Sequence, residues 1–133
     1  MPDKGATPRM LLVEPETMLR RTVALTARSL GMAEIREAAS MQQARQLLKE
    51  ERYDGAVIAI DSDAAYDLSL VAQVREGGSV SRPGMPIAVM TERCTAELLG
   101  TLRQQKIDRI IVKPFRARAL LDAFGALEAA AAT

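Results

Sequence analysis

The sequence contains no histidine and no tryptophan, and only one of its 133 residues is a cysteine. Without histidine the chain cannot carry a Ser-His or Cys-His catalytic pair, a histidine-based metal site or a phosphohistidine. Aromatic residues make up 3% of the chain, too few for a platform on which nucleic-acid bases stack. The single Cys94 cannot form an internal disulfide, which favours a reducing compartment. These absences exclude most hydrolase classes and predict a cytoplasmic protein.

The net charge and the length of the chain narrow the possible class of protein further. The formal net charge is +1, so the bulk charge gives no reason to expect a nucleic-acid or anionic membrane partner. The longest apolar run falls well short of the roughly 18 residues that a membrane span requires. Residues 1–8 lack the apolar segment of a signal peptide and the end from Ala129 is alanine-rich, so both are expected to be soft ends. We therefore predict one globular domain over residues 9–128.

Short apolar runs alternate along the chain with longer segments of helical spacing, which predicts a parallel sheet covered by helices on both faces. Gly31 is expected just past the end of the first helix. The expected strands are Arg9–Val13, Ala33–Ala38, Gly55–Ile60, Ile87–Met90 and Ile107–Val112. The expected helices are Thr17–Leu30, a helix capped by Ser40 that runs to about Glu51, Ala64–Glu76, Thr95–Lys106 and Arg116–Glu128.

Polar side chains follow several of these strands. Glu14 follows the first strand, Asp61 the third, Thr91 the fourth and Lys113 the fifth. Because sites in such sheets form beyond the carboxyl ends of the strands, we expect these side chains to converge. A hydroxyl and an ammonium can hold phosphoryl oxygens while carboxylates hold a divalent cation, so the group is typical of a phosphoryl or anion site.

Three segments, taken in order, resemble a known family. Met10–Glu16 is similar to the opening of response-regulator receiver domains, Pro86–Thr91 to their fourth strand, and Val112–Phe115 to their Lys-Pro-Phe motif, whose Lys-Pro bond is usually cis. The 22-residue step from Thr91 to Lys113 also fits. The resemblance implies a flavodoxin-like, doubly wound α/β fold with five parallel strands in the order 2-1-3-4-5 and five helices. It also implies a role in two-component signalling.

The same resemblance exposes departures from the family pattern. The phosphoacceptor aspartate falls on Ala59, a register supported by the match of Asp67–Val71 to the family's third helix. Alanine has no nucleophilic oxygen, so it cannot form an acyl phosphate. The second acidic position is Pro15, which cannot ligate a metal, and the aromatic switch position is Ile110. The resemblance therefore implies a degenerate receiver.

The residues that remain have structural interpretations as well. Glu14 and Asp61 are the weak metal candidates left, too few for a tight magnesium site. Lys113 is expected to pair with Glu14 or Asp61, and Thr91 either caps the helix near Thr95 or binds nearby backbone. Asp61 lies two residues beyond Ala59, on the same side of an extended chain. It is therefore the candidate for a displaced acceptor.

We expect a stand-alone, non-enzymatic domain without a cofactor that acts by binding proteins. A histidine kinase, a phosphotransfer protein or another signalling protein is the expected partner, and a homodimer is left open. A stripe on the first helix is the candidate docking surface, with an ordinary solvated face as its alternative; it consists of Met18, Arg21, Leu25 and Arg28.

Three alternatives remain. A nucleic-acid-binding module is disfavoured by the nearly neutral charge of the chain. A conventional receiver phosphorylated on Asp61 would require magnesium. A flavodoxin-type cofactor binder shares the expected fold, but no Ser/Thr/Gly-rich phosphate loop follows the first strand.

Overall fold

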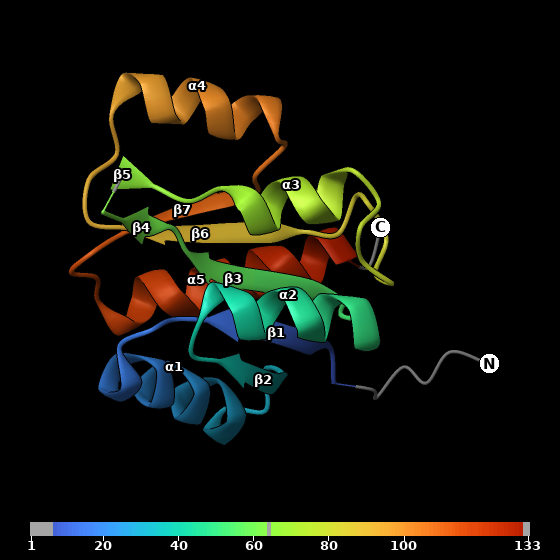
Figure 1. Cartoon of the computed structure of the whole chain (residues 1–133). Coiled ribbons are helices and arrows are strands. Elements are labelled where there is room, and N and C mark those ends of the chain that lie inside the picture. The colour runs from blue at the N-terminus through green and yellow to red at the C-terminus, as the bar shows by residue number, and fades with distance from the viewer. Residues whose placement is uncertain (1–6, 64, 132–133) are drawn as a thin grey trace.

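A central parallel sheet organises the protein. The computed structural model describes residues 7–63 and 65–131. The five-stranded sheet has the order β2-β1-β3-β6-β7, which is the predicted order 2-1-3-4-5 (Figure 1). Its strands are β1 (Arg9–Val13), β2 (Glu34–Ala38), β3 (Gly55–Ala59), β6 (Ile87–Thr91) and β7 (Arg109–Val112). The predicted fold class is confirmed.

Five helices connect the strands and cover both faces of the sheet. α1 and α5 pack on one face, and α2, α3 and α4 pack on the other. Their bounds are α1 (Thr17–Ser29), α2 (Met41–Glu50), α3 (Ser69–Arg75), α4 (Ala96–Gln104) and α5 (Ala117–Ala131). A parallel sheet buried in this way presents apolar side chains in both directions, which explains the uninterrupted apolar runs of β1, β3 and β6.

Successive residues of each strand pack alternately into the apolar cores on the two faces of the sheet, because the side chains of a strand alternate between its faces. Leu12 and Val57 are partners in the β1–β3 register and both pack toward α1 and α5. Their successors Val13 and Ile58 are also partners and pack toward α2, α3 and α4. All four are at most 1% exposed, so the central strands form a rigid base for the loops that follow them.

Two predicted helix boundaries rest on capping contacts that the structure confirms. Gly31 follows α1 with a φ of 65°, and the N–H of Met32 donates to the carbonyl of Ala27 at 3.0 Å. A glycine adopts this left-handed conformation without a Cβ penalty. Before α2, the Ser40 hydroxyl accepts from the N–H of Gln43 at 3.1 Å. Both ends are therefore encoded locally.

The predicted start of the third helix was wrong. Ala64 lies outside the described residues, and the residues on either side of it form a small antiparallel hairpin. Its strands are β4 (Asp61–Ser62) and β5 (Ala65–Tyr66), and α3 begins only at Ser69. Ala65 has a φ of 89°, which an L-residue adopts at a cost, so contacts with other parts of the chain must hold the hairpin.

The other boundaries shift by a few residues. β7 begins at Arg109 instead of Ile107, and α5 begins at Ala117 instead of Arg116. α5 also continues to Ala131, so the alanine-rich segment from Ala129 belongs to a helix in its described part. Residues 132–133 of that segment and residues 1–6 of the N-terminal extension lie outside the described residues.

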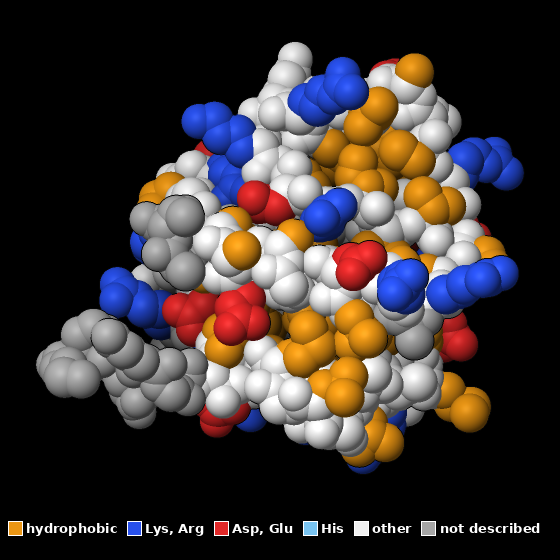
Figure 2. Space-filling model, turned by 180° about the vertical axis from the view of Figure 1, so that it is seen from behind, with side chains coloured by type: hydrophobic (Ala, Val, Ile, Leu, Met, Phe, Trp, Pro, Cys, Tyr) orange, Lys and Arg blue, Asp and Glu red, His pale blue; other side chains and the backbone are white. Residues whose placement is uncertain are grey.

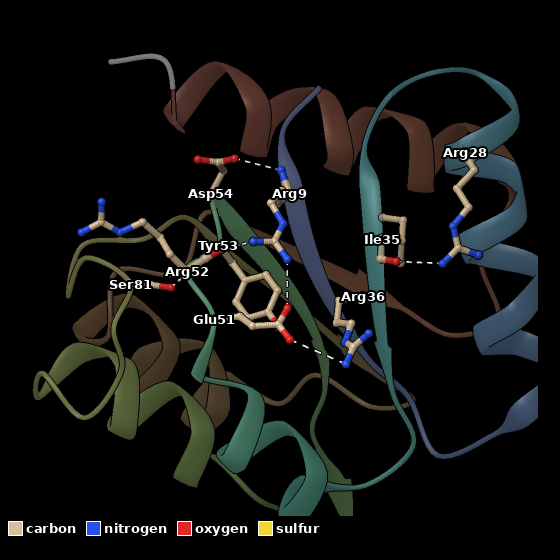
Figure 3. Close-up of polar contacts among 9 residues, drawn as sticks. All are labelled: Arg9, Arg28, Ile35, Arg36, Glu51, Arg52, Tyr53, Asp54 and Ser81. Atoms are coloured by element: carbon tan, nitrogen blue, oxygen red, sulfur yellow. Dashed lines mark hydrogen bonds and ion pairs between the residues drawn. The ribbon is translucent and has the colours of Figure 1, made fainter. Parts of the chain in front are cut away.

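A polar cluster closes the amino ends of β1 and β3, on the side opposite the predicted site (Figure 3). The Arg9 guanidinium lies over the Tyr53 ring, 5.7 Å from its centroid, and pairs with Glu51 at 2.9 Å. The Tyr53 hydroxyl donates to the same carboxylate at 3.2 Å. Burial, followed by the negative charge of Glu51, raises the pKa of Tyr53 to about 12.

Candidate functional site

The loops after the parallel strands gather at the carboxyl edge of the sheet, on the left in Figure 1. Glu14 directly follows β1 and Lys113 directly follows β7, while Ala59 ends β3 and Thr91 ends β6. These four positions therefore occupy neighbouring strand ends, as parallel pairing requires.

Lys113 forms an ion pair with Glu14, which decides between the two partners expected for it. The Glu14 side chain is 2% exposed and that of Lys113 is 16% exposed. The second oxygen of Glu14 accepts from the N–H of Glu16 at 3.0 Å. Both carboxylate oxygens of Glu14 therefore have donors within the domain, and the ammonium of Lys113 is neutralised there. The Lys113–Pro114 bond is cis, as the resemblance implies.

Ala59 places an apolar methyl group at this edge of the sheet. It is 6% exposed and pairs in register with Met90 of β6, and both belong to the apolar cluster beneath α1 and α5. Pro15, which the resemblance assigns to the second acidic position, is exposed. The end of β3 thus carries a methyl group, while the ion pair of Glu14 and Lys113 joins the ends of β1 and β7.

Asp61 is held by Thr91 and by the loop after β6. The Thr91 hydroxyl donates to one oxygen of Asp61, and the N–H of Glu92 donates to the other at 2.8 Å. The Thr91 oxygen also accepts from the N–H of Arg93 at 3.3 Å. Thr91 therefore binds nearby backbone, one of its two expected roles, whereas Thr95 itself caps α4 by accepting from Leu98 at 3.1 Å.

The β4–β5 hairpin is fastened to the loop after β6. The Tyr66 hydroxyl donates to the carbonyl of Arg93 at 2.8 Å. Where the hairpin leads into α3, Asp67 accepts from the N–H of Ser69 at 2.9 Å. Hydrogen bonds from the hydroxyl and the N–H of Ser69 lower the pKa of Asp67. No local pattern in the sequence indicates this role for Tyr66, because its partner lies 27 residues away.

The carboxylates of the site do not assemble into a metal site in the structure. Glu14 is occupied by Lys113, and Asp61 by Thr91 and Glu92. Within residues 7–63 and 65–131, no three acidic or cysteine side chains gather closely enough to hold a metal ion. Glu14 and Asp61 therefore remain separate candidates, each with donors of its own.

A family model for the response regulator receiver domain matches residues 10–125. The chain belongs to this family. The match reaches all five strands of the parallel sheet, lacking only Arg9 at the start of β1, and includes the four residue positions described above. Its role is therefore that of a receiver domain in two-component signalling.

Solved structures share the fold of this receiver domain at low sequence identity. The first is a CheY-like receiver domain protein from Methanospirillum hungatei, with a TM-score of 0.83 and 20% identity over 96% of this chain and 98% of that one. The chemotaxis protein CheY4 of Vibrio cholerae has a TM-score of 0.80 and 21% identity over 92% and 99%. HP1043, an orphan response regulator of H. pylori, has a TM-score of 0.74 and 22% identity over 94% and 99%. No protein with a curated description matches the chain.

The predicted docking stripe on α1 is only partly free. Met18 and Leu25 are 79% and 64% exposed, and Arg21 is exposed as well. Arg28, however, donates to the carbonyl of Ile35 at 2.7 Å (Figure 3). It also pairs with Glu37 of β2 at 3.4 Å. On α1 this receiver domain therefore offers two exposed apolar side chains and Arg21, which has no hydrogen-bond or ion-pair partner among the described residues, while Arg28 is engaged with β2.

Other features of the receiver domain bear on its partners. Ile110, which the resemblance assigns to the aromatic switch position, is partly buried against the core beneath α2, α3 and α4. The face shown in Figure 2 carries basic and acidic side chains scattered between apolar groups, without a broad area of one sign. Among the described residues, no helix is both long and apolar enough to span a bilayer.

Proposed function

We propose that this receiver domain works without phosphorylation and signals by binding other proteins. The observation that carries the proposal is Ala59, a buried methyl at the end of β3 where the family resemblance locates the acceptor aspartate. An alanine cannot attack a phosphodonor, because it lacks a nucleophilic oxygen. In this proposal the domain is not an enzyme, takes no cofactor and acts in the cytoplasm.

The surrounding contacts support the proposal. A lysine that binds a phosphoryl oxygen must present its ammonium to the ligand, whereas Lys113 is held by Glu14. The hydroxyl of Thr91 and the N–H of Glu92 both donate to Asp61, so two further donors are already in use. A phosphoryl group entering the site would have to displace carboxylates from each of these donors.

Partner classes follow from the family and from the free part of α1. We propose a histidine kinase, a phosphotransfer protein or another signalling protein as the partner, docking on Met18, Arg21 and Leu25. Exposed methionine and leucine beside an arginine provide the apolar centre and the charged rim that protein interfaces use.

The test is phosphoryl transfer from a small donor. The full chain is incubated with acetyl phosphate and magnesium, quenched and weighed intact. We expect no mass gain in the wild type or in Asp61→Asn. A gain of one phosphoryl mass that Asp61→Asn abolishes would contradict the proposal and establish Asp61 as a displaced acceptor.

A second arm uses Ala59→Asp, which returns a carboxylate to the end of β3. We expect this variant to fold and to remain poorly phosphorylated, because Pro15 offers no oxygen to a magnesium ion. Efficient labelling of Ala59→Asp would show that Pro15 is compatible with metal-assisted transfer. The failure of the wild type to accept a phosphoryl group would then be due to Ala59 alone.

A further inference from the structure

A hollow of about 550 Å³ opens beside the pair of Lys113 and Glu14. It is formed by the loops that follow β1, β6 and β7 together with the start of α1, so it lies at the same carboxyl edge of the sheet. Its lining consists of Glu16, Leu19, Glu92, Lys113, Pro114 and Phe115.

One wall of this hollow is formed by apolar side chains. Leu19 and Phe115 are half-buried and pack against the apolar cluster beneath α1 and α5, which fixes them in place. Pro114 is exposed beside them. This wall suits an aliphatic chain, because burying carbon against it removes apolar surface from water.

The rim of the hollow is acidic. Glu16 and Glu92 are exposed, and neither carboxylate has a hydrogen bond or ion pair with a residue that the structure describes. Their N–H groups are used instead, by Glu14 and Asp61 respectively. Lys113 is the one cation in the described lining, and Glu14 neutralises it. The rim therefore carries two uncompensated negative charges.

We propose that this hollow receives an arginine or lysine side chain from a partner protein. The aliphatic stem would lie along Leu19, Pro114 and Phe115, and the cation would lie between Glu16 and Glu92. Basic side chains can bury their stems on apolar surface while their charged ends stay in a polar environment. The inference rests on the proposed function, because a partner that delivers a phosphoryl group would bring an anion to the same rim.

The neighbouring part of α1 defines the partner further. Met18 directly precedes Leu19 in α1 and is 79% exposed, and Leu25 lies further along the helix at 64%. A segment that fills the hollow with a cation can place an apolar side chain on Met18. We therefore assign the site to a basic segment with adjacent apolar residues.

Three dipeptides test the charge preference on the full, isotopically labelled chain by NMR titration. They are acetyl-arginyl-leucine amide, its uncharged citrulline analogue and a phosphoserine analogue. We expect the arginine peptide to shift the backbone amides of Leu19, Glu92 and Phe115, with at least about threefold weaker binding for citrulline and none for phosphoserine. Raising the salt concentration should weaken binding of the arginine peptide, because exposed charges are screened.

Paired variants locate the site. Glu16→Gln combined with Glu92→Gln should weaken the arginine peptide by about fivefold, because two exposed ion pairs are lost. The control is Glu76→Gln, an exposed carboxylate at the end of α3, which should leave the affinity unchanged. Equal binding of arginine and citrulline, stronger binding of phosphoserine, or no shift with any peptide at about 50 mM would overturn the inference.

The two proposals fail separately. Phosphoryl uptake by the wild-type chain overturns the proposed function, whatever the peptides do. Absence of both uptake and an arginine preference overturns only the assignment of the hollow.

Discussion

The ammonium of Lys113 lies against the carboxylate of Glu14, a residue 99 positions earlier in the chain, and joins the loop after β7 to the end of β1. Removing one partner of such a pair leaves the other charge in a poorly solvated place. The strength of the pair is therefore best measured through the stability of the fold.

We expect Lys113→Met to lower the free energy of unfolding by about 1–3 kcal/mol, because Glu14 would lose its cation while only 2% exposed. Denaturant unfolding of the two proteins measures the difference. Lys49→Met, at an exposed position on α2, is the matched control and should change little. Equal stability of Lys113→Met and wild type would mean that Lys113 is not a structural anchor.

The hydrogen bonds of Asp61 predict how strongly the amides of the loop after β6 are protected from hydrogen exchange. In Asp61→Ala the N–H of Glu92 loses its acceptor, whereas the Thr91 hydroxyl can still donate to the carbonyl of Arg93 at 3.1 Å. We expect hydrogen exchange of the Glu92 amide to accelerate by about tenfold, the factor that corresponds to roughly 1.4 kcal/mol.

Asp63→Ala serves as the control for this measurement, because Asp63 is exposed in the same hairpin. Its effect on the Glu92 amide should be negligible. An unchanged exchange rate in Asp61→Ala would show that the loop after β6 does not depend on the carboxylate.

The raised pKa of Tyr53 predicts that the folded protein loses stability in alkaline solution. Its pKa is raised from 10.0 to about 12, so the folded protein holds the phenolic proton more tightly than the unfolded chain does. The stabilisation is fully present below about pH 10 and is lost as the pH rises through 12. The lost contribution is on the order of 2 kcal/mol.

Unfolding midpoints measured from pH 8 to about pH 12 check this expectation. Tyr53→Phe should show a weaker decline than wild type, because it carries no ionisable hydroxyl in the cluster. Tyr66→Phe, which removes the other tyrosine, should decline as wild type does. Parallel declines in wild type and Tyr53→Phe would assign the alkaline loss to other groups.

Arg75 at the end of α3 forms hydrogen bonds with two loops on the side of the molecule away from the site. Its guanidinium donates to the carbonyls of Gln105, Met85, Pro83 and Lys106 at 2.7, 2.7, 2.8 and 3.1 Å. Burial lowers the pKa of Arg75, and the negative charge of Asp108 opposes this effect. One cation thus satisfies backbone acceptors from two loops.

We expect Arg75→Met to cost about 2 kcal/mol of unfolding free energy, because carbonyls lose a charged donor and a methionine cannot replace it. Thermal or denaturant unfolding measures the loss. Arg103→Met, an exposed residue in the last turn of α4, is the control and should be near neutral. A loss no larger than that of Arg103→Met would contradict a stabilising role for the guanidinium.

The sequence predicted the parallel sheet because that part of the fold is encoded locally. Apolar runs such as Gly55–Ile60 reveal buried strands, and Ser40 and Gly31 reveal helix ends, without knowledge of any distant contact. The third helix was placed too early for the opposite reason. The hairpin that replaces its first turn depends on Tyr66 reaching Arg93, and no local pattern announces such a contact.

The same distinction applies to the site. Residues after strands could be predicted to converge, because parallel strand ends share one edge. Which carboxylate pairs with Lys113 could not be decided, since Glu14 and Asp61 are equivalent as charges and differ only in where their loops turn. The engagement of Arg28 with β2 and of Arg75 with four carbonyls was missed, because an arginine in a helix has no spacing that reveals its acceptor.

Arg28 bears on how molecules of this protein meet in solution. β2 lies at the end of the sheet, where a strand has backbone groups that no neighbour in its own sheet satisfies. The guanidinium covers one of them, the carbonyl of Ile35, and its positive charge faces any strand that approaches this edge. Edge-to-edge addition of a second chain would have to remove that side chain first. The edge of β2 therefore offers one acceptor fewer to another strand than its backbone alone would provide.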